Sequence, residues 1–307
     1  MYANDHAGTK SIEVRAAMKP PPFDYALAQS VEEAVALLAR HGDDAKVIAG
    51  GQSLMPLLAF RMAAPKLLID IGPIAALRNI TIDGRGVTLG ALVRWRDIER
   101  HAGLAEAHPL LAEAVTHIAH YQIRNRGTVG GSLAHADPAA ELPGVAVACE
   151  AEIEVAGPKV RRNLAAKDFF VDSLTTALGS DELVVSVRFP AWKRDRRWAF
   201  EEFARRRGDF ALAGVALFYD VAQGKAVDPH IAAIGVAATP VRLGAAEKAL
   251  AGRAVDAGAI ANVVAAAAAN IDPPGDIHAP GDYRRALLGV LLERALARSA
   301  GLTLEAA

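Results

Sequence analysis

Apolar and polar positions in the first part of the chain predict helices alternating with short strands. Apolar residues recur at helical spacing over residues 31–41, between a capping serine and a glycine that ends the helix. Short apolar runs at residues 46–49 and 66–71 predict strands, and residues 53–60 predict a second helix. This order predicts an α/β unit in which the turn Ala49-Gly50-Gly51-Gln52-Ser53 follows a strand.

The middle of the chain predicts a hairpin followed by helices and further strands. Residues 80–82 and 87–91 alternate around an Asp-Gly turn, which is typical of a β-hairpin. Gly84, Gly86 and Gly90 imitate a Rossmann fingerprint, but that motif needs a helix directly after the glycines and a strand follows here, so we exclude it. Helical spacing returns over residues 109–121, and a helix-like stretch is expected at residues 164–169.

The last third of the chain has a different pattern, after a boundary rich in lysine and arginine at residues 190–197. Three strands and then two helices are predicted there, over residues 198–203, 212–219, 231–236, 255–269 and 283–300. Leucines at helical spacing give the last helix an apolar face. These elements predict a small α+β domain.

The composition excludes several classes of function. The 307 residues carry 34 basic and 35 acidic side chains, so no net charge attracts nucleic acid or an anionic membrane. There is no stretch long enough for a membrane span and no signal-peptide core, so we expect a cytoplasmic protein with a loose extension over residues 1–17. The single cysteine, Cys149, lies in an apolar run, which favours a buried thiol and excludes a cysteine-ligated iron–sulfur cluster held by this chain alone.

Two glycine pairs are the strongest candidates for chemistry. Gly50-Gly51 and Gly130-Gly131 each lie beside a serine or threonine in a run of small residues. Without Cβ atoms, successive backbone N–H groups can converge on an anion, and the hydroxyl groups add donors. Two such turns suit a diphosphate held from both sides, as in a dinucleotide. From spacing alone, ordinary tight turns explain the same residues equally well.

Longer motifs around these pairs resemble a known family. Residues 117–143, HIAHYQIRNRGTVGGSLAHADPAAELP, and residues 48–54, IAGGQSL, closely resemble the FAD-binding medium subunit of molybdenum hydroxylases, the group of xanthine and carbon monoxide dehydrogenases. The motifs ARRRGDF at residues 204–210 and HAPGDYRR at residues 278–285 also match patterns of that family. The resemblance therefore covers nearly the whole chain.

The resemblance implies an α+β fold. It consists of a two-subdomain FAD-binding fold of the vanillyl-alcohol-oxidase type, followed by the small α+β C-terminal domain, for which the strand pattern predicts a three-stranded sheet with helices. We expect the first FAD-binding subdomain at residues 18–74, the second at residues 75–190 and the C-terminal domain at residues 197–303.

The resemblance also implies which residues bind FAD. In that family both glycine turns donate backbone N–H groups to the pyrophosphate, here Gly50, Gly51, Gln52, Ser53, Thr128, Gly130, Gly131 and Ser132. Further FAD contacts are implied for Ile48, Ala49, Leu54, Ile118, Gly127, Leu183 and Phe210. The carboxylate that holds the adenosine ribose corresponds to Glu141, which is one methylene longer than the more usual Asp, and Asp137 is the alternative. We expect the FAD to be noncovalent.

Some of these side chains have a plainer explanation. Leu183 fits a core leucine in a strand as well as a flavin contact, and Phe210 fits core packing under the C-terminal sheet. His117 and His120 have the spacing of a metal-binding pair, but no third ligand is placed, so we favour structural roles. His135 is the residue to suspect of covalent flavin attachment, against which the resemblance argues. No metal site and no catalytic residue is predicted.

The function implied by the resemblance is that of an electron-transfer flavoprotein subunit. A molybdopterin-binding large subunit would hydroxylate the substrate, [2Fe-2S] clusters on a small subunit would carry the electrons, and FAD on this chain would pass them to an external acceptor. A dimer of such heterotrimers is expected. The alternative is a self-contained FAD-dependent oxidoreductase that acts directly on a small organic substrate, for which a C-terminal domain of this size is small.

Overall fold

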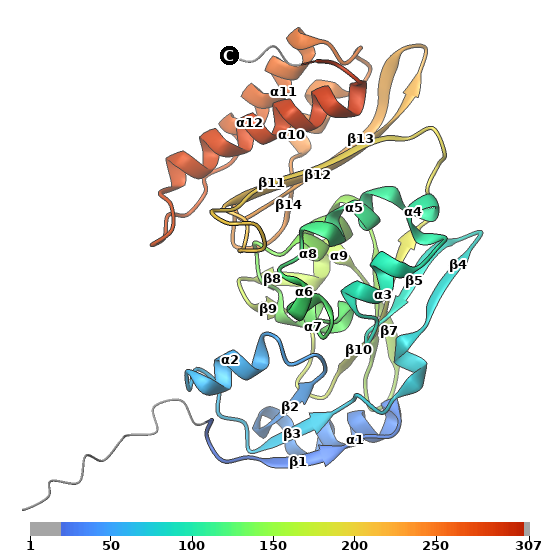
Figure 1. The fold of residues 1–307 in the computed structure, drawn as a ribbon, viewed down its shortest axis with the longest axis vertical. Coiled ribbons are helices and arrows are strands. Elements are labelled where there is room, and N and C mark those ends of the chain that lie inside the picture. Colours follow the sequence, from blue (N-terminus) through green and yellow to red (C-terminus); the bar gives the residue numbers. More distant parts are fainter. Residues whose placement is uncertain (1–19, 304–307) are drawn as a thin grey trace, which may run out of the picture.

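Of the four sheets in the described residues, the three larger ones follow one another along the long axis of the molecule (Figure 1). The computed structural model describes residues 20–303, so the extension predicted over residues 1–17 lies outside the described residues. We call the three layers the N-terminal, central and C-terminal sheets. None of the helices within the described range is both long and apolar enough to cross a membrane.

The N-terminal sheet is the predicted α/β unit. Its three parallel strands pair in the order β1 (Asp24–Leu27), β3 (Leu67–Asp70), β2 (Ala45–Ile48). Helix α1 (Val31–His41) joins the first two strands in sequence, and Ser30 caps it by accepting a hydrogen bond from the Glu33 N–H. Helix α2 (Leu54–Ala59) follows β2. The first glycine turn therefore lies at the carboxyl end of β2, as the sequence predicts.

The central sheet carries most of the helices. Its antiparallel strands lie in the order β4 (Ile80–Asp83), β5 (Gly86–Gly90), β10 (Leu183–Pro190), β6 (Glu152–Ala156) and β7 (Arg161–Ala165). Between β5 and β6 the chain forms α3 (Trp95–Arg100), α4 (Leu104–Ala107), α5 (Pro109–His117), α6 (Tyr121–Arg124), α7 (Val129–His135) and α8 (Glu141–Ala148). After β7 come α9 (Ala166–Phe169) and the two-stranded sheet of β8 (Phe170–Asp172) and β9 (Thr175–Thr176).

Two predicted helices of this region differ in the structure. The helix predicted over residues 109–121 ends at His117, because Ala119 adopts a φ of 47°, which an α-helix cannot accommodate. The stretch 164–169 is half strand and half helix, since β7 runs through Ala165 before α9 begins. The first break matters for the site, because it brings Ala119 and His120 against the C-terminal domain.

The C-terminal sheet is an antiparallel meander with one strand more than predicted. Its order is β11 (Arg197–Phe203), β12 (Ala213–Ala222), β13 (Lys225–Ile234) and the two-residue β14 (Val241–Arg242). Three helices rather than two cover its outer face, namely α10 (Gly244–Leu250), α11 (Ala257–Ala269) and α12 (Gly281–Ala300) (Figure 1). The extra strand and helix are too short for a periodicity to reveal them.

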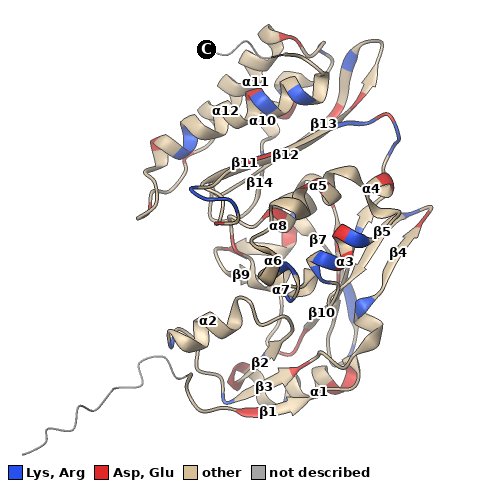
Figure 2. Ribbon diagram, in the orientation of Figure 1, with Lys and Arg blue, Asp and Glu red and all other residues tan. Residues whose placement is uncertain are grey.

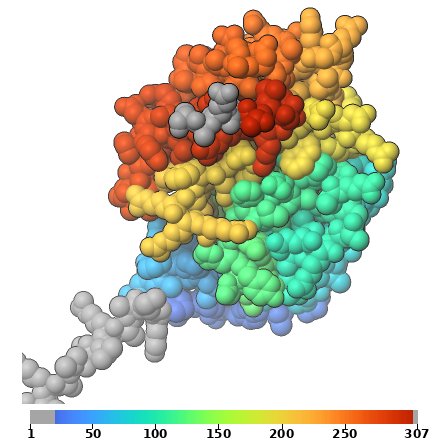
Figure 3. All heavy atoms as spheres, turned by 45° about the horizontal axis from the view of Figure 1, so that its top comes forward, coloured from blue at the N-terminus to red at the C-terminus, as the bar shows by residue number. Residues whose placement is uncertain are grey.

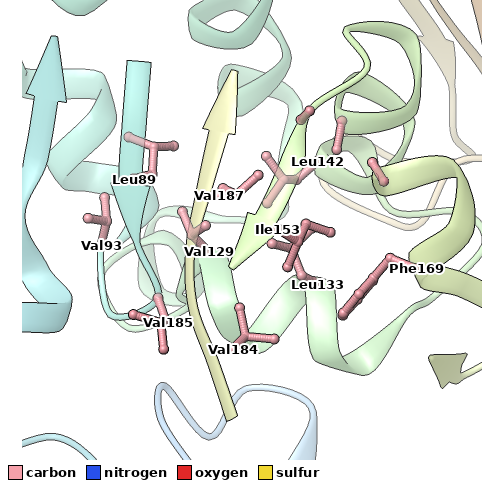
Figure 4. Packing of buried hydrophobic residues seen from close by; sticks show 14 of the residues in the cluster. Leu89, Val93, Val129, Leu133, Leu142, Ile153, Phe169, Val184, Val185 and Val187 are labelled. Atoms are coloured by element: carbon pink, nitrogen blue, oxygen red, sulfur yellow. The ribbon is translucent and has the colours of Figure 1, made fainter. Parts of the chain in front are cut away.

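Two hydrophobic cores hold these layers together. The larger joins the N-terminal and central sheets and continues into the C-terminal sheet through Phe200 and Phe218. Figure 4 shows part of it, where Val129 and Leu133 of α7 pack toward the central sheet. The second core lies between the C-terminal sheet and its three helices. The C-terminal sheet is therefore covered on both faces. The loop between β11 and β12 approaches the central sheet and the helices packed on it, which together are called the central unit below.

Candidate functional site

The first glycine turn presents a row of unpaired backbone donors. Residues 50–53 connect β2 to α2, and within residues 20–303 no acceptor receives a hydrogen bond from their four N–H groups. Two carbonyl groups of the turn, in contrast, have donors. Gln52 Nε2 donates to the Gly50 carbonyl at 3.1 Å, and the Met55 N–H donates to the Gly51 carbonyl at 3.0 Å. Consecutive N–H groups without internal partners form an anion-binding site.

Gly50 is required by contact with the second glycine segment. A Cβ on Gly50 would lie 2.2 Å from the Arg126 carbonyl oxygen and 3.1 Å from the Gly127 Cα. The two motifs, distant in sequence, therefore meet backbone to backbone. Gly51 has a different reason, since its φ of 72° lies in the left-handed region that favours glycine. Protein packing, rather than room for a phosphate, is thus sufficient to explain glycine at position 50.

The second glycine segment is a helix N-terminus rather than an open turn. Thr128 caps α7, and the Gly131 N–H donates to the Thr128 Oγ1 at 3.2 Å. The Gly130 N–H donates to the Ala91 carbonyl at 2.8 Å, and a Cβ there would lie 2.5 Å from the Ala91 Cβ. In the structure both glycine N–H groups therefore have acceptors within the protein, and diphosphate binding by Gly130 and Gly131 stays a prediction. The side-chain donor of this segment is the hydroxyl of Ser132.

Glu141 is a buried carboxyl group beside these motifs. It is the first residue of α8, it is 7% exposed, and its carboxyl group has no hydrogen bond to another described residue. Burial first, and the negative charge of Glu202 second, raise its pKa to about 8. Asp137 differs, because its Oδ1 accepts a hydrogen bond from the Ala139 N–H at 2.9 Å. A protonated Glu141 can both donate to and accept from a hydroxyl group.

Comparison with known proteins identifies the family of the chain. Residues 21–192 match the family model described as the FAD binding domain in molybdopterin dehydrogenase, and residues 198–299 match the CO dehydrogenase flavoprotein C-terminal domain. The chain belongs to this FAD-binding family. The fold family and the cofactor, FAD, that the sequence motifs predict are therefore confirmed.

Individual relatives agree along their whole length. The chain is 41% identical to the 6-hydroxypseudooxynicotine dehydrogenase complex subunit alpha of Paenarthrobacter nicotinovorans, over 92% of this chain and 96% of that one. It is 39% identical to the carbon monoxide dehydrogenase medium chain of Hydrogenophaga pseudoflava, over 91% and 97%. A carbon monoxide dehydrogenase structure from that organism superposes with a TM-score of 0.89 at 40% identity, covering 92% of this chain and 99% of that one.

The loop between β11 and β12 of this flavoprotein lies against the broken helix. A Cβ on Gly208, whose φ is 89°, would lie 2.5 Å from His120 Nδ1 and 2.8 Å from the Ala119 carbonyl oxygen. In Figure 3 this loop reaches the green part of the chain from the C-terminal domain. Phe210 is 63% exposed, so core packing under the C-terminal sheet is wrong for this residue. Ile118, next to Ala119, is buried.

The other candidates occupy separate surroundings. Leu183 is buried at the start of β10 within the larger core, so core packing is sufficient to explain it. His117 and His120 do not lie on one helix as a metal-binding pair would, because His117 ends α5 whereas His120 precedes α6 and contacts Gly208. Burial lowers the pKa of His135 and raises the pKa of the Cys149 thiol to about 12, so Cys149 is a neutral core thiol.

One acidic residue of the site has no clear signal in the sequence. Glu202 of β11 has an Oε2 atom that is buried without a hydrogen-bond partner among the described residues, and its Oε1 lies 3.4 Å from His117 Nδ1. This contact raises the pKa of His117, and Glu113 at 3.7 Å adds to the effect. Only the packing of the C-terminal sheet onto α5 and α8 places Glu202 near Glu141.

Proposed function

We propose that this flavoprotein is the electron-transferring medium subunit of a heteromeric molybdenum hydroxylase and that its FAD is noncovalent. The observation that carries the assignment of the site is the row of unpaired N–H groups at Gly50–Ser53, which lies against the second glycine segment at Arg126–Gly127. An anion-binding turn at a strand end fits a diphosphate. When bound, FAD supplies one- and two-electron transfer, and the protein supplies binding and orientation.

Within this proposal, each group of residues has a separate role. The first glycine turn holds the diphosphate, with Thr128 and Ser132 at the α7 N-terminus on its other side. The buried Glu141 takes the ribose hydroxyl groups, since Asp137 already accepts a backbone hydrogen bond. The remaining contacts to the cofactor come from Ile48, Ala49, Leu54, Ile118, Gly127, Leu183 and Phe210.

The partners follow from what this chain lacks for the full reaction. Its only cysteine is a buried thiol with a pKa of about 12, which does not supply the four thiolates of an iron–sulfur cluster. We therefore assign the [2Fe-2S] clusters to a small subunit and the molybdenum cofactor to a large subunit, in a dimer of heterotrimers located in the cytoplasm. Relatives named as a medium chain and as a complex subunit support a multi-subunit assembly.

A self-contained FAD oxidoreductase is the competing function. Such an enzyme needs a face on which an organic substrate can bind. Here α10–α12 cover one face of the C-terminal sheet and the central unit covers the other, and residues 213–219 of β12 are buried throughout. This arrangement favours an electron-transfer subunit.

Charge at the first glycine turn provides the test of the FAD site. Gly51→Asp places a carboxylate where the diphosphate is expected, and Gly51→Asn is a neutral control of equal size that tolerates the same left-handed backbone. We expect the flavin absorbance per chain to collapse in the Asp variant and to be retained better in the Asn variant. Equal flavin content in Gly51→Asp and the parent chain would refute the site.

The assignment of partners has its own experiment. The native complex should contain iron and molybdenum in fixed ratio to this chain, and the isolated chain should not oxidise the substrate of the complex. Turnover of that substrate by the isolated flavoprotein would instead establish the self-contained enzyme.

A further inference from the structure

Arg284, in the HAPGDYRR motif, is a buried guanidinium with three acceptors. It lies in the first turn of α12 and is 6% exposed, which is rare for an arginine unless it is paired. Its Nη1 donates to the Leu212 carbonyl at 2.6 Å and to the Gly235 carbonyl at 2.9 Å. Its Nη2 donates to Asp276 Oδ2 at 2.8 Å. These four residues are called the Arg284 cluster below.

Two of these acceptors lie at the base of the loop of residues 204–211, called the arginine-rich loop below, whereas Asp276 lies between α11 and α12. Leu212 is the residue at which the loop of residues 204–211 rejoins the sheet, and its N–H donates to the Phe203 carbonyl at 2.8 Å across the loop's base. Gly235 directly follows β13, and its N–H donates to the Pro138 carbonyl at 2.9 Å, between α7 and α8. The Arg284 guanidinium therefore connects Leu212, at the base of the loop, to Gly235, at the end of β13. Gly235 is in turn hydrogen-bonded to Pro138, the residue after Asp137.

The segment that contains Asp276 and precedes α12 also holds the arginine-rich loop at a second point. Arg205 Nη2 donates to the His278 carbonyl. Asp276 orders this part of the chain, because its Oδ1 accepts hydrogen bonds from the N–H groups of His278 at 2.8 Å and Ala279 at 3.0 Å. Asp276 therefore links both attachments, since its other oxygen binds Arg284. Figure 2 shows the arginine run of the loop in blue at the edge of the C-terminal sheet.

We infer that Arg284 is a positioning residue that holds the arginine-rich loop in its place against the Ala119–His120 segment. Charged donors to buried carbonyls make strong, directional hydrogen bonds. The planar guanidinium holds its donors on separate nitrogens in a rigid fork, a geometry that a lysine ammonium cannot reproduce. The placement of the loop goes beyond the proposed function. If FAD lies beside this loop, Arg284 also fixes the surroundings of the cofactor, and only this consequence rests on the proposed function.

Arg285 provides a matched control. The neighbouring guanidinium donates to the Ile271 carbonyl at 3.1 Å, to Asp272 at 2.6 Å and to Asp282 at 2.7 Å, and none of these acceptors lies in the arginine-rich loop. Arg285→Met therefore removes a comparable number of hydrogen bonds from the same helix turn. It leaves both attachments of the loop intact.

Limited trypsin digestion of the full chain tests the inference, because the loop contains three consecutive arginines. In native protein, cleavage follows the population of the locally open state. We expect cleavage within residues 205–207 to be on the order of tenfold faster in Arg284→Met than in Arg285→Met, with Arg284→Lys between them. Hydrogen exchange of the amides of residues 204–212 should likewise be fastest in Arg284→Met, intermediate in Arg284→Lys and slowest in Arg285→Met. It is measured well below the melting temperature of each variant.

Equal cleavage and equal exchange in the Arg284 and Arg285 variants would overturn the inference. If Arg284→Met does not fold, Asp276→Asn replaces it, since this variant keeps the arginine and removes the charge that links the two attachments. Flavin content, measured in parallel, separates the two proposals. A loosened loop with normal flavin content supports the Arg284 cluster and refutes its effect on FAD, whereas a parent chain without flavin refutes the proposed function alone.

Discussion

Replacing Glu141 by glutamine should make the protein more stable at neutral pH and should remove a pH dependence. The carboxyl group is buried, and its pKa of about 8 in the folded chain compares with 4.5 for an unperturbed glutamate. A raised carboxyl pKa favours folding of the protonated form. The stability is fully present below the unfolded pKa and is lost as the pH rises through the folded pKa.

The magnitude follows from the difference between the two pKa values. At about 1.4 kcal/mol per pKa unit, the shift from 4.5 to about 8 gives a loss of stability that approaches about 5 kcal/mol above the folded pKa. Near pH 7 the loss is about 3 kcal/mol. Glutamine does not ionise, so Glu141→Gln avoids this loss while keeping nearly the same volume.

Urea unfolding of the flavin-free chain at a series of pH values measures this effect. The stability of Glu141→Gln relative to the parent chain should rise by about 3 kcal/mol between about pH 5 and about pH 8. Glu293→Gln on the exposed side of α12 is the control for the same chemical change at the surface. A stability difference between Glu141→Gln and the parent that does not change with pH would show that the Glu141 carboxyl group ionises normally, and the predicted pKa shift would then be wrong.

Three further predictions concern other residues of the site. Gly50→Ala should cost about 1 to 3 kcal/mol of stability, seen as a lower melting temperature, because its Cβ would lie 2.2 Å from the Arg126 oxygen, whereas Gly84→Ala, with nothing within 4 Å, should be neutral. Phe210→Ala should change the stability by less than about 0.5 kcal/mol but alter the rate of flavin reoxidation; a loss of stability with an unchanged rate would contradict a role at the flavin. Cys149 should not react with a thiol reagent until the chain unfolds, and rapid labelling of the native protein would contradict its burial.

The features that could be predicted from the residues alone are the local ones. The α/β unit at the N-terminus could be predicted because the Ser30 cap, the helical spacing and the short apolar runs act within a few residues of one another. The family could be predicted because four motifs occur in the expected order along nearly the whole chain. Both kinds of signal are contained in contiguous stretches of sequence.

The contacts that these residues make depend on how the elements pack together. Gly50 needs to be glycine because of Arg126, the Gly130 N–H is already bonded to Ala91, and Glu141 is shifted in pKa by burial and by Glu202. In each case the partner comes from another element, so spacing along the chain carries no trace of it. Burial and hydrogen-bond pairing depend on which segments pack together, and this is why the motifs predicted the cofactor but not which N–H groups remain available to bind it.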